Sequence, residues 1–133
     1  MNQILIQKQH YLNLLKWKFH LLKATTSQKG NLAELQAISY LEDNGFLIIQ
    51  KNYYAKKIGE IDIIATKDDI YHFIEVKSGH NFEAVYNITK SKLYKLYKSV
   101  EYYLQTKKLN VSYCVDAIIV SNNEIEFLEN ISL

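Results

Sequence analysis

The alternation of apolar and polar residues is clearest between positions 59 and 79, where it predicts a β-hairpin. Residues 59–65 and 70–79 both alternate with period two, and a charged break at 67–69 separates them. Such alternation on both sides of a short polar break is typical of two antiparallel strands joined by a turn. The sequence therefore places a hairpin at the centre of the chain.

Side chains two residues apart point to the same face of a strand, so the hairpin can be divided into faces. In the second strand, Glu75 and Lys77 share a face. If the pairing places Asp62 opposite Glu75, two carboxylates and one ammonium group converge on one patch. In the first strand, the alternation separates two sets of side chains: Glu60, Asp62 and Ile64 on one face, and Ile61, Ile63 and Ala65 on the other.

Apolar residues recur at helical spacing over residues 3–23, which predicts an amphipathic helix. Three interpretations of this helix stay open: it packs on the domain's own core, it pairs with another subunit, or it lies as a basic helix on a membrane surface. Residues 24–30 contain Thr-Thr-Ser and a glycine, and they are predicted to form a linker.

A second helix is predicted over residues 31–43, with the favourable cap Asn44-Gly45 at its end. Glu34 lies in its first turn, where a carboxylate complements the helix dipole. Glu34 could equally point at the carboxylate patch of the hairpin, and the spacing alone leaves both interpretations open. The buried stripe of this helix is expected to consist of Leu32, Leu35, Ala37, Ile38 and Leu41.

The remaining segments complete a mixed α/β pattern. Residues 46–55 are predicted to form a strand before the hairpin, and residues 80–87 a loop over the patch. Two further strands are predicted at 111–120 and 124–129. Residues 89–107 show a helical period of three and four, with a stripe formed by Leu93, Leu96, Tyr97, Val100, Tyr103 and Leu104.

Composition narrows the class of protein. With 133 residues, of which 48% are hydrophobic and 23% charged, the chain is typical of one globular domain. The single cysteine, Cys114, excludes an internal disulfide framework and a multi-cysteine zinc site. Neither a signal-peptide pattern nor a membrane-spanning apolar stretch is visible, so a cytoplasmic protein is expected.

All 16 basic residues are lysine, and they are unevenly distributed although the net charge is only +2. Residues 1–30 carry five lysines and no carboxylate, and residues 85–108 carry six lysines and one acid. A basic segment beside an acidic site suits a polyanion such as nucleic acid, bound at a metal centre. A solvated helix surface coated with lysine is the alternative.

Asp62, Glu75 and Lys77 together have the composition of a metal-dependent phosphodiesterase. Two carboxylates within about 4 Å repel by roughly 4 kcal/mol at an effective dielectric near 20, so a proton or a cation must intervene. Oxygen ligands, including the backbone carbonyl of Val76, suit Mg²⁺ or Mn²⁺. Lys77 could orient the attacking water or neutralise charge in the transition state. An ordinary salt bridge between Glu75 and Lys77 on an exposed sheet face is the competing interpretation.

The motif Glu60-Ile61-Asp62, followed by Glu75-Val76-Lys77, resembles the PD-(D/E)XK nuclease superfamily. More narrowly, the chain resembles the YraN-like family of small bacterial proteins, which are predicted nucleases similar to archaeal Holliday junction resolvases. The resemblance covers residues 29–120 and rests on several motifs in the same order: Gly30, Ala33-Glu34, Ala37, Tyr40-Leu41, Gly45-Phe46, Asn52, residues 59–65 and residues 73–77.

This resemblance implies an α/β fold: a restriction-endonuclease-like αβββαβ core with a mixed central sheet flanked by helices. Residues 29–133 would form this nuclease-like domain, and residues 1–28 an N-terminal helical extension. The resemblance also implies site roles. It assigns metal binding to Asp62 and Glu75, action on the water to Lys77, and a supporting place at the metal to Glu34.

Two lysines at the start of the later helix, Lys90 and Lys92, are candidates for nucleic-acid binding, because related nucleases place a polar or basic residue there. A solvated lysine is equally compatible with that position. Asp116 matches an aspartate common in this strand of the family and is interpreted as structural or as supporting the site. The chain departs from the family after Lys77, where Ser78-Gly79-His80 replaces the usual basic residue.

Three hypotheses for function follow. The first is a Mg²⁺-dependent DNA endonuclease, with branched DNA such as Holliday junctions as the substrate class suggested by the resemblance. The second is a catalytically inactive nuclease fold that binds nucleic acid. The third is an interaction module whose N-terminal helix docks a protein partner or a second copy of the chain. A homodimer fits the first and third hypotheses, because resolvases cut two strands with two subunits.

Overall fold

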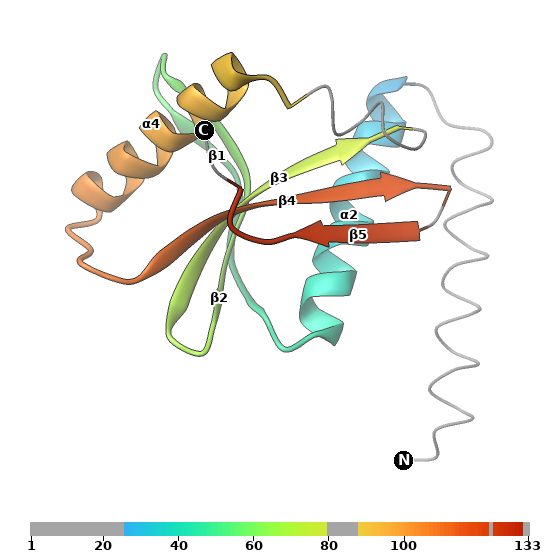
Figure 1. The fold of residues 1–133 in the computed structure, drawn as a ribbon, viewed down its shortest axis with the longest axis horizontal. Coiled ribbons are helices and arrows are strands. Elements are labelled where there is room, and N and C mark those ends of the chain that lie inside the picture. Colours follow the sequence, from blue (N-terminus) through green and yellow to red (C-terminus); the bar gives the residue numbers. More distant parts are fainter. Residues whose placement is uncertain (1–25, 80–87, 123, 132–133) are drawn as a thin grey trace.

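The computed structural model describes residues 26–79, 88–122 and 124–131. The predicted helix over 3–23 and the predicted loop over 80–87 lie outside these residues. Figure 1 shows the described elements, which are in chain order α2 (Thr26–Asp43), β1 (Leu47–Ala55), β2 (Gly59–Lys67), β3 (Ile70–Ser78), α4 (Lys90–Thr106), β4 (Tyr113–Ser121) and β5 (Glu124–Leu128).

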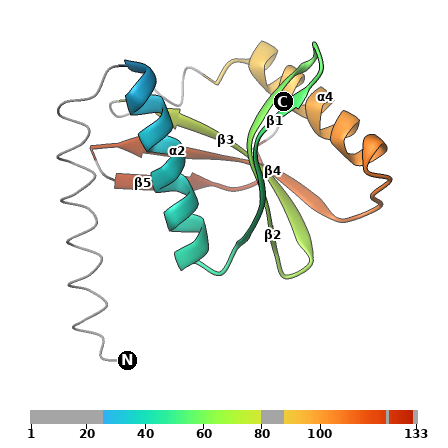
Figure 2. The same ribbon diagram turned by 180° about the vertical axis from the view of Figure 1, so that it is seen from behind.

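The five strands form one mixed sheet in the order β1-β2-β3-β4-β5. Strands β3 and β4 are parallel, and the other neighbours are antiparallel. Helix α4 connects the two parallel strands, as a crossover requires. The two helices cover opposite faces: α2 crosses β3, β4 and β5, as Figure 2 shows from behind, and α4 lies over β1 and β2. The restriction-endonuclease-like αβββαβ core is therefore confirmed.

Each face of the sheet buries its own hydrophobic core. On the α4 face, the helical stripe predicted over 89–107 is confirmed, because Leu93, Leu96, Val100 and Tyr103 are buried. The core on the α2 face contains Ala33, Ala37, Leu41, Phe46, Ile63, Ala65, Ile74, Ile118 and Val120. The core on the α4 face contains Ile61, Ile64, Phe73, Leu96, Val100, Tyr103 and Val115.

The predicted hairpin is present, and its turn shows why the charged break ends one strand and starts the next. Lys67 pairs with Ile70, which leaves a two-residue loop. Both loop residues have a positive φ, 52° at Asp68 and 63° at Asp69. Two-residue hairpin loops favour this backbone because it matches the twist of the strands, and aspartate tolerates it.

The start of α2 differs from the prediction. The helix begins at Thr26, so the predicted linker over 24–30 is wrong from residue 26 onward. The predicted division of the chain between residues 28 and 29 stays a prediction, although α2 runs across it. The predicted cap at Asn44-Gly45 is confirmed: Gly45 has φ 86°, and the Phe46 N–H donates to the Leu41 carbonyl at 2.9 Å.

The buried face of α2 also differs from the prediction. Leu35 was expected in the buried stripe but is 43% exposed. The reason is that Ala33, Ala37 and Leu41 recur every four residues and face the sheet. Leu35 is two residues from Ala33 and Ala37, which places it about 200° round the helix from both. Alanine at positions 33 and 37 places small side chains between the helix and the sheet.

The strict alternation predicted for β2 breaks at Asp62. Ile61 packs with Ile64 in the core on the α4 face, whereas Ile63 packs in the core on the α2 face. The prediction that Ile61 and Ile63 share a face is therefore wrong. The break has a local cause in the neighbouring strand, where Asn52 lies opposite Asp62 with φ 53°, a left-handed conformation inside β1.

The start of β2 lies against α4 so closely that only glycine fits. A Cβ on Gly59 would lie 2.8 Å from the Ser99 hydroxyl oxygen, which is buried and donates to the Lys95 carbonyl. We therefore expect Gly59→Ala to lower the free energy of unfolding by about 1–3 kcal/mol, as overpacking does. Urea denaturation would measure it.

A matched control is Gly30→Ala, because a Cβ on Gly30 in α2 would meet nothing within 4 Å. Alanine favours a helix over glycine, so this change should stabilise the protein by about 0.5–1 kcal/mol. Equal effects of the two substitutions would contradict the close approach of Gly59 to α4.

Candidate functional site

The hairpin strands separate where the candidate site begins. The pairing of β2 with β3 ends at Ile63 and Ile74, one residue before Asp62 and Glu75 would meet. Asp62 instead accepts a hydrogen bond from the Val76 N–H, with Oδ2 and N 2.8 Å apart. The N–H and C=O of one strand residue point to the same side, so the Val76 carbonyl also faces β2 at this opening. The opening thus gathers a carboxylate and a backbone carbonyl.

Glu75 and Lys77 lie side by side on β3. The Lys77 ammonium and the Glu75 carboxylate are 3.1 Å apart, and both side chains are largely covered, with 26% and 20% exposed. The salt bridge offered as the competing interpretation therefore exists, but not on an open face. It also places a cation directly at the carboxylate site.

Two further carboxylates reach this site, from α2 and from the start of β2. With the amide of Asn52 oriented to donate, its nitrogen lies 3.2 Å from Glu34 Oε2 and 3.2 Å from Glu60 Oε1. The charges of Glu34 and Glu60 both raise the pKa of Asp62. Of the two interpretations left open for Glu34, the structure supports the one in which it faces the hairpin patch.

The site contains four carboxylates, those of Glu34, Glu60, Asp62 and Glu75, and the pKa of three of them is raised. Burial, followed by the charge of Glu75, raises the pKa of Asp62 to about 8. Burial also raises the pKa of Glu34, where the charge of Glu60 adds to it, and the pKa of Glu60, where the charge of Glu75 adds to it. The metal-free protein therefore holds a proton at this site near neutral pH.

The donor set fits a hard divalent cation. A proton held between crowded carboxylates marks a place where a cation would lower the repulsion. The oxygen donors of Asp62, Glu75, Glu34 and the Val76 carbonyl are those that Mg²⁺ and Mn²⁺ prefer. Lys77 balances part of the charge without closing the opening between β2 and β3.

The raised pKa of Asp62 predicts a pH dependence of stability. The pKa of this carboxyl is about 8 in the folded protein, against the ordinary aspartate value of 3.8. Between these two pH values, the carboxyl is protonated in the folded protein and loses its proton on unfolding. The metal-free wild type should therefore lose stability as the pH rises through this window. Asp62→Asn cannot titrate and keeps an oxygen for the Val76 N–H. We expect its stability relative to wild type to rise by about 1–3 kcal/mol from pH 5 to pH 8, since one pKa unit corresponds to about 1.4 kcal/mol.

Urea denaturation in the presence of a chelator at both pH values would test this expectation. Asp68→Asn, in the exposed hairpin turn, is the matched control for replacing a carboxylate. A difference between Asp62→Asn and wild type that stays constant with pH would contradict the assigned burial of the Asp62 carboxylate.

Lys90 and Lys92 belong to α4, a different element from those that carry the carboxylates. Both are exposed in the first turn of α4, where the Thr89 hydroxyl caps the helix by accepting from the Lys92 N–H. The lysine charges that lower the pKa of the site carboxylates are those of Lys51 and Lys77. The nucleic-acid role of Lys90 and Lys92 stays a prediction that the carboxylate geometry does not require.

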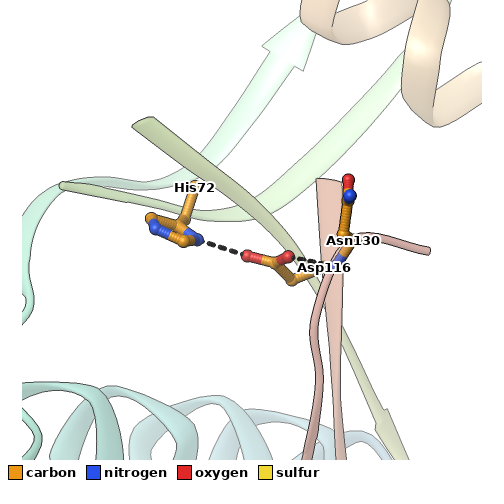
Figure 3. A network of polar contacts seen from close by, with 3 residues as sticks. All are labelled: His72, Asp116 and Asn130. Carbon is orange, nitrogen blue, oxygen red and sulfur yellow. Dashed lines mark hydrogen bonds and ion pairs between the residues drawn. The ribbon is translucent and has the colours of Figure 1, made fainter. Parts of the chain in front are cut away.

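Asp116 makes its hydrogen bonds with His72 and Asn130. It is fully buried in β4, with Oδ2 2.6 Å from His72 Nδ1 and Oδ1 accepting the Asn130 N–H at 2.7 Å. Figure 3 shows Asp116 between His72 on β3 and Asn130, which follows β5. One buried carboxylate therefore ties three segments together, in line with the structural interpretation of this residue.

Cys114 joins His72 and Asp116 in a cluster whose potential ligand atoms all lie within 4.8 Å of one another. Two ligands of one tetrahedral ion are about 3.3 Å apart at usual bond lengths of about 2.0–2.1 Å. The distance of 2.6 Å between His72 Nδ1 and Asp116 Oδ2 is shorter than this, so these two atoms form a direct hydrogen bond and do not share an ion. Burial, followed by the charge of Asp116, raises the pKa of the Cys114 thiol, which disfavours the thiolate that a metal would need.

Asn52 and Glu60 belong to the site although the residue pattern alone did not assign them a role there. Glu60 precedes Ile61-Asp62, and the signals for it were its place on the same predicted face as Asp62 and its place in the motif of the family resemblance. Asn52 follows Gln50-Lys51 in β1 and stands among the motifs of the resemblance, but no role was assigned to it. Its left-handed backbone is what turns the amide toward the carboxylates, and no periodicity reports a backbone angle.

Comparison with known proteins places this site in a family. Residues 33–120 match the model of the uncharacterised protein family UPF0102. A UPF0102 protein of Aliarcobacter butzleri is 54% identical over 109 residues, which cover 81% of this chain and 99% of the relative. The chain belongs to the UPF0102 family. UPF0102 proteins of a Sulfurovum species and of Wolinella succinogenes are 51% and 52% identical over 105 residues, covering 78% and 79% of this chain and 93% and 96% of those relatives.

UPF0102 is the YraN family, so the resemblance drawn from the motifs is confirmed, and with it the PD-(D/E)XK nuclease-like character of the family. The family is uncharacterised, so membership shows which proteins this chain is related to, and its activity has to be argued from the site. In the described part of the chain, no helix combines the length and apolarity that crossing a membrane demands.

Proposed function

We propose that this UPF0102 protein is a divalent-metal-dependent endonuclease that hydrolyses phosphodiester bonds in DNA. The observation that carries the proposal is the opening between β2 and β3, where Asp62, Glu75 and Glu34 crowd together beside Lys77. A carboxylate cluster that holds a proton near neutral pH, with a lysine at its edge, has the chemistry for a cation and a phosphate.

Each residue has a part that follows from its place. Asp62, Glu75 and the Val76 carbonyl would hold the cation, and Glu34 would reach it from α2. A bound Mg²⁺ or Mn²⁺ would polarise a phosphoryl oxygen and lower the pKa of a water molecule. Lys77, fixed by its 3.1 Å contact with Glu75, orients the water and offsets negative charge on the phosphate. The Val76 N–H holds the Asp62 carboxylate in place.

The first test is calorimetric titration of Mn²⁺ and Mg²⁺ into the wild type and into Asp62→Asn, together with a cleavage assay. We expect the wild type to bind metal and to nick DNA, and Asp62→Asn to lose both while it remains folded. A four-way junction and a linear duplex of the same sequence distinguish branched from unbranched substrates. Metal binding and cleavage that survive in Asp62→Asn would contradict the assignment of the site.

The alternative function is a nuclease fold that binds nucleic acid without turnover. The exposed lysines of α4 favour this alternative, because Lys90, Lys92 and Lys95 follow one another along its first turns. It predicts DNA affinity whose logarithm falls linearly with the logarithm of the salt concentration, and no product at any metal concentration. The expected homodimer is tested separately, by the mass in solution of the full chain and of a chain without residues 1–28.

A further inference from the structure

One polar side chain at the site has no part in the chemistry proposed above. Asn52 lies in β1 between Lys51, which pairs with Ile63, and Tyr53, which pairs with Ile61. It is therefore opposite Asp62, at the point where the alternation of β2 breaks. Its φ of 53° is unusual within a strand, where an extended backbone is the rule. Asparagine is among the few residues that adopt this conformation readily.

The left-handed backbone has a chemical consequence. It brings the Asn52 amide nitrogen to 3.2 Å from Glu34 Oε2 and 3.2 Å from Glu60 Oε1. A side-chain amide has two N–H donors, so one group can serve both carboxylates. Each glutamate uses only one oxygen in this contact, which leaves Glu34 Oε1 and Glu60 Oε2 for another partner. The two carboxylates belong to different elements, α2 and β2, so the amide joins these elements at this point.

We propose that Asn52 is a positioning residue that holds the carboxylates of Glu34 and Glu60 at the metal site. This inference rests on the proposed function, because it takes the two carboxylates to be part of the proposed metal site. The physical argument is that like charges repel and would turn away from one another in the absence of a shared donor. A neutral donor between them holds both side chains without occupying the place of the cation. Groups that orient metal ligands in this way typically change metal affinity by about 10- to 100-fold when they are removed.

The test uses the full-length protein and Asn52→Gly. Glycine adopts a positive φ without strain, so this variant removes the amide and keeps the backbone. Lys56→Gly is the matched control, because Lys56 also has a positive φ, 49°, in the turn after β1, and its ammonium lies over the Tyr102 ring. We expect calorimetry with Mn²⁺ to show a dissociation constant at least about tenfold higher for Asn52→Gly and unchanged for Lys56→Gly.

A dissociation constant for Asn52→Gly within twofold of the wild type would overturn the inference. A second measurement separates this inference from the proposed function and does not depend on the folding of Asn52→Gly. In the metal-free protein, the side-chain amide resonances of Asn52 should shift in Glu34→Gln and in Glu60→Gln. If the wild type takes up no Mn²⁺, the proposed function fails, and these resonances alone decide whether Asn52 holds the two glutamates. Resonances that do not move in either variant would overturn the contact itself.

Discussion

Replacing Lys77 with alanine should lower the rate of DNA cleavage by at least about 100-fold while leaving metal affinity intact. A positioned side chain that moves or steers a proton typically contributes about 10²–10⁴ in rate. The Lys77 ammonium is 3.1 Å from Glu75 and is only 26% exposed, so its position is fixed at the carboxylates. Removing a positive charge beside the carboxylates does not weaken their hold on a cation. Single-turnover cleavage at saturating Mn²⁺ and calorimetry on the same samples would measure the two effects.

The chain offers a close control for this change. Lys98 also pairs with a glutamate, Glu101, at 3.3 Å, but on the exposed surface of α4. Lys98→Ala removes the same charge from the same kind of pair away from the carboxylates, so its rate should stay near that of the wild type. An equal loss of rate in Lys77→Ala and Lys98→Ala would show that overall charge, not the place of Lys77, controls cleavage. Unimpaired cleavage by Lys77→Ala would remove Lys77 from the proposed chemistry.

The fold could be predicted largely because its signals are local. The alternation around residues 67–69 and the two aspartates of the turn specify the hairpin without help from the rest of the chain. The helical stripe from Leu93 to Leu104 is similarly self-contained. The parallel pairing of β3 with β4 depends on distant parts of the chain, and here the family resemblance supplied what periodicity could not.

The candidate site could be predicted only in part, because its residues meet through tertiary structure. Asp62, Glu75 and Lys77 follow from the hairpin, since they occupy neighbouring positions on two paired strands. Whether Glu34 faces them depends on how α2 lies across the sheet, and the spacing within α2 does not contain that information. Asn52 depends on a single backbone angle that departs from the strand pattern around it.

The error in the predicted faces of β2 has the same origin as the site. The prediction for β2 assumed unbroken alternation, and the alternation breaks at Asp62, opposite the left-handed Asn52. Breaks in regular structure and crowded carboxylates cost stability, and proteins tolerate them where function requires them. The gain in stability expected for Asp62→Asn at high pH would measure the cost of the crowded carboxylates. The break in the alternation of β2, which the sequence pattern did not predict, therefore lies where the chemistry is proposed.

The second large effect is expected at Asp116, a residue of β4 to which the proposed chemistry assigns no role. Asp116→Ala should lower the free energy of unfolding by about 3–5 kcal/mol, because a buried donor left without its acceptor costs about 1–3 kcal/mol and Asp116 serves two such donors. Asp116 is fully buried, and both of its oxygens are used, one by His72 and one by the Asn130 N–H. Alanine would leave the imidazole and this N–H without their acceptor in a space closed to water. Urea denaturation would measure the change.

Two comparisons make this prediction specific. Asp116→Asn keeps an oxygen for the Asn130 N–H and should cost less than Asp116→Ala, because only the acceptor facing His72 is lost. Glu101→Ala breaks the exposed pair with Lys98 and should cost at most about 1 kcal/mol, as surface ion pairs do. If Asp116→Ala were no more costly than Glu101→Ala, the buried carboxylate would not be the tie between β3, β4 and the segment after β5. In that case the other interpretation of Asp116, as a group that supports the candidate site, would gain weight, and metal affinity would test it.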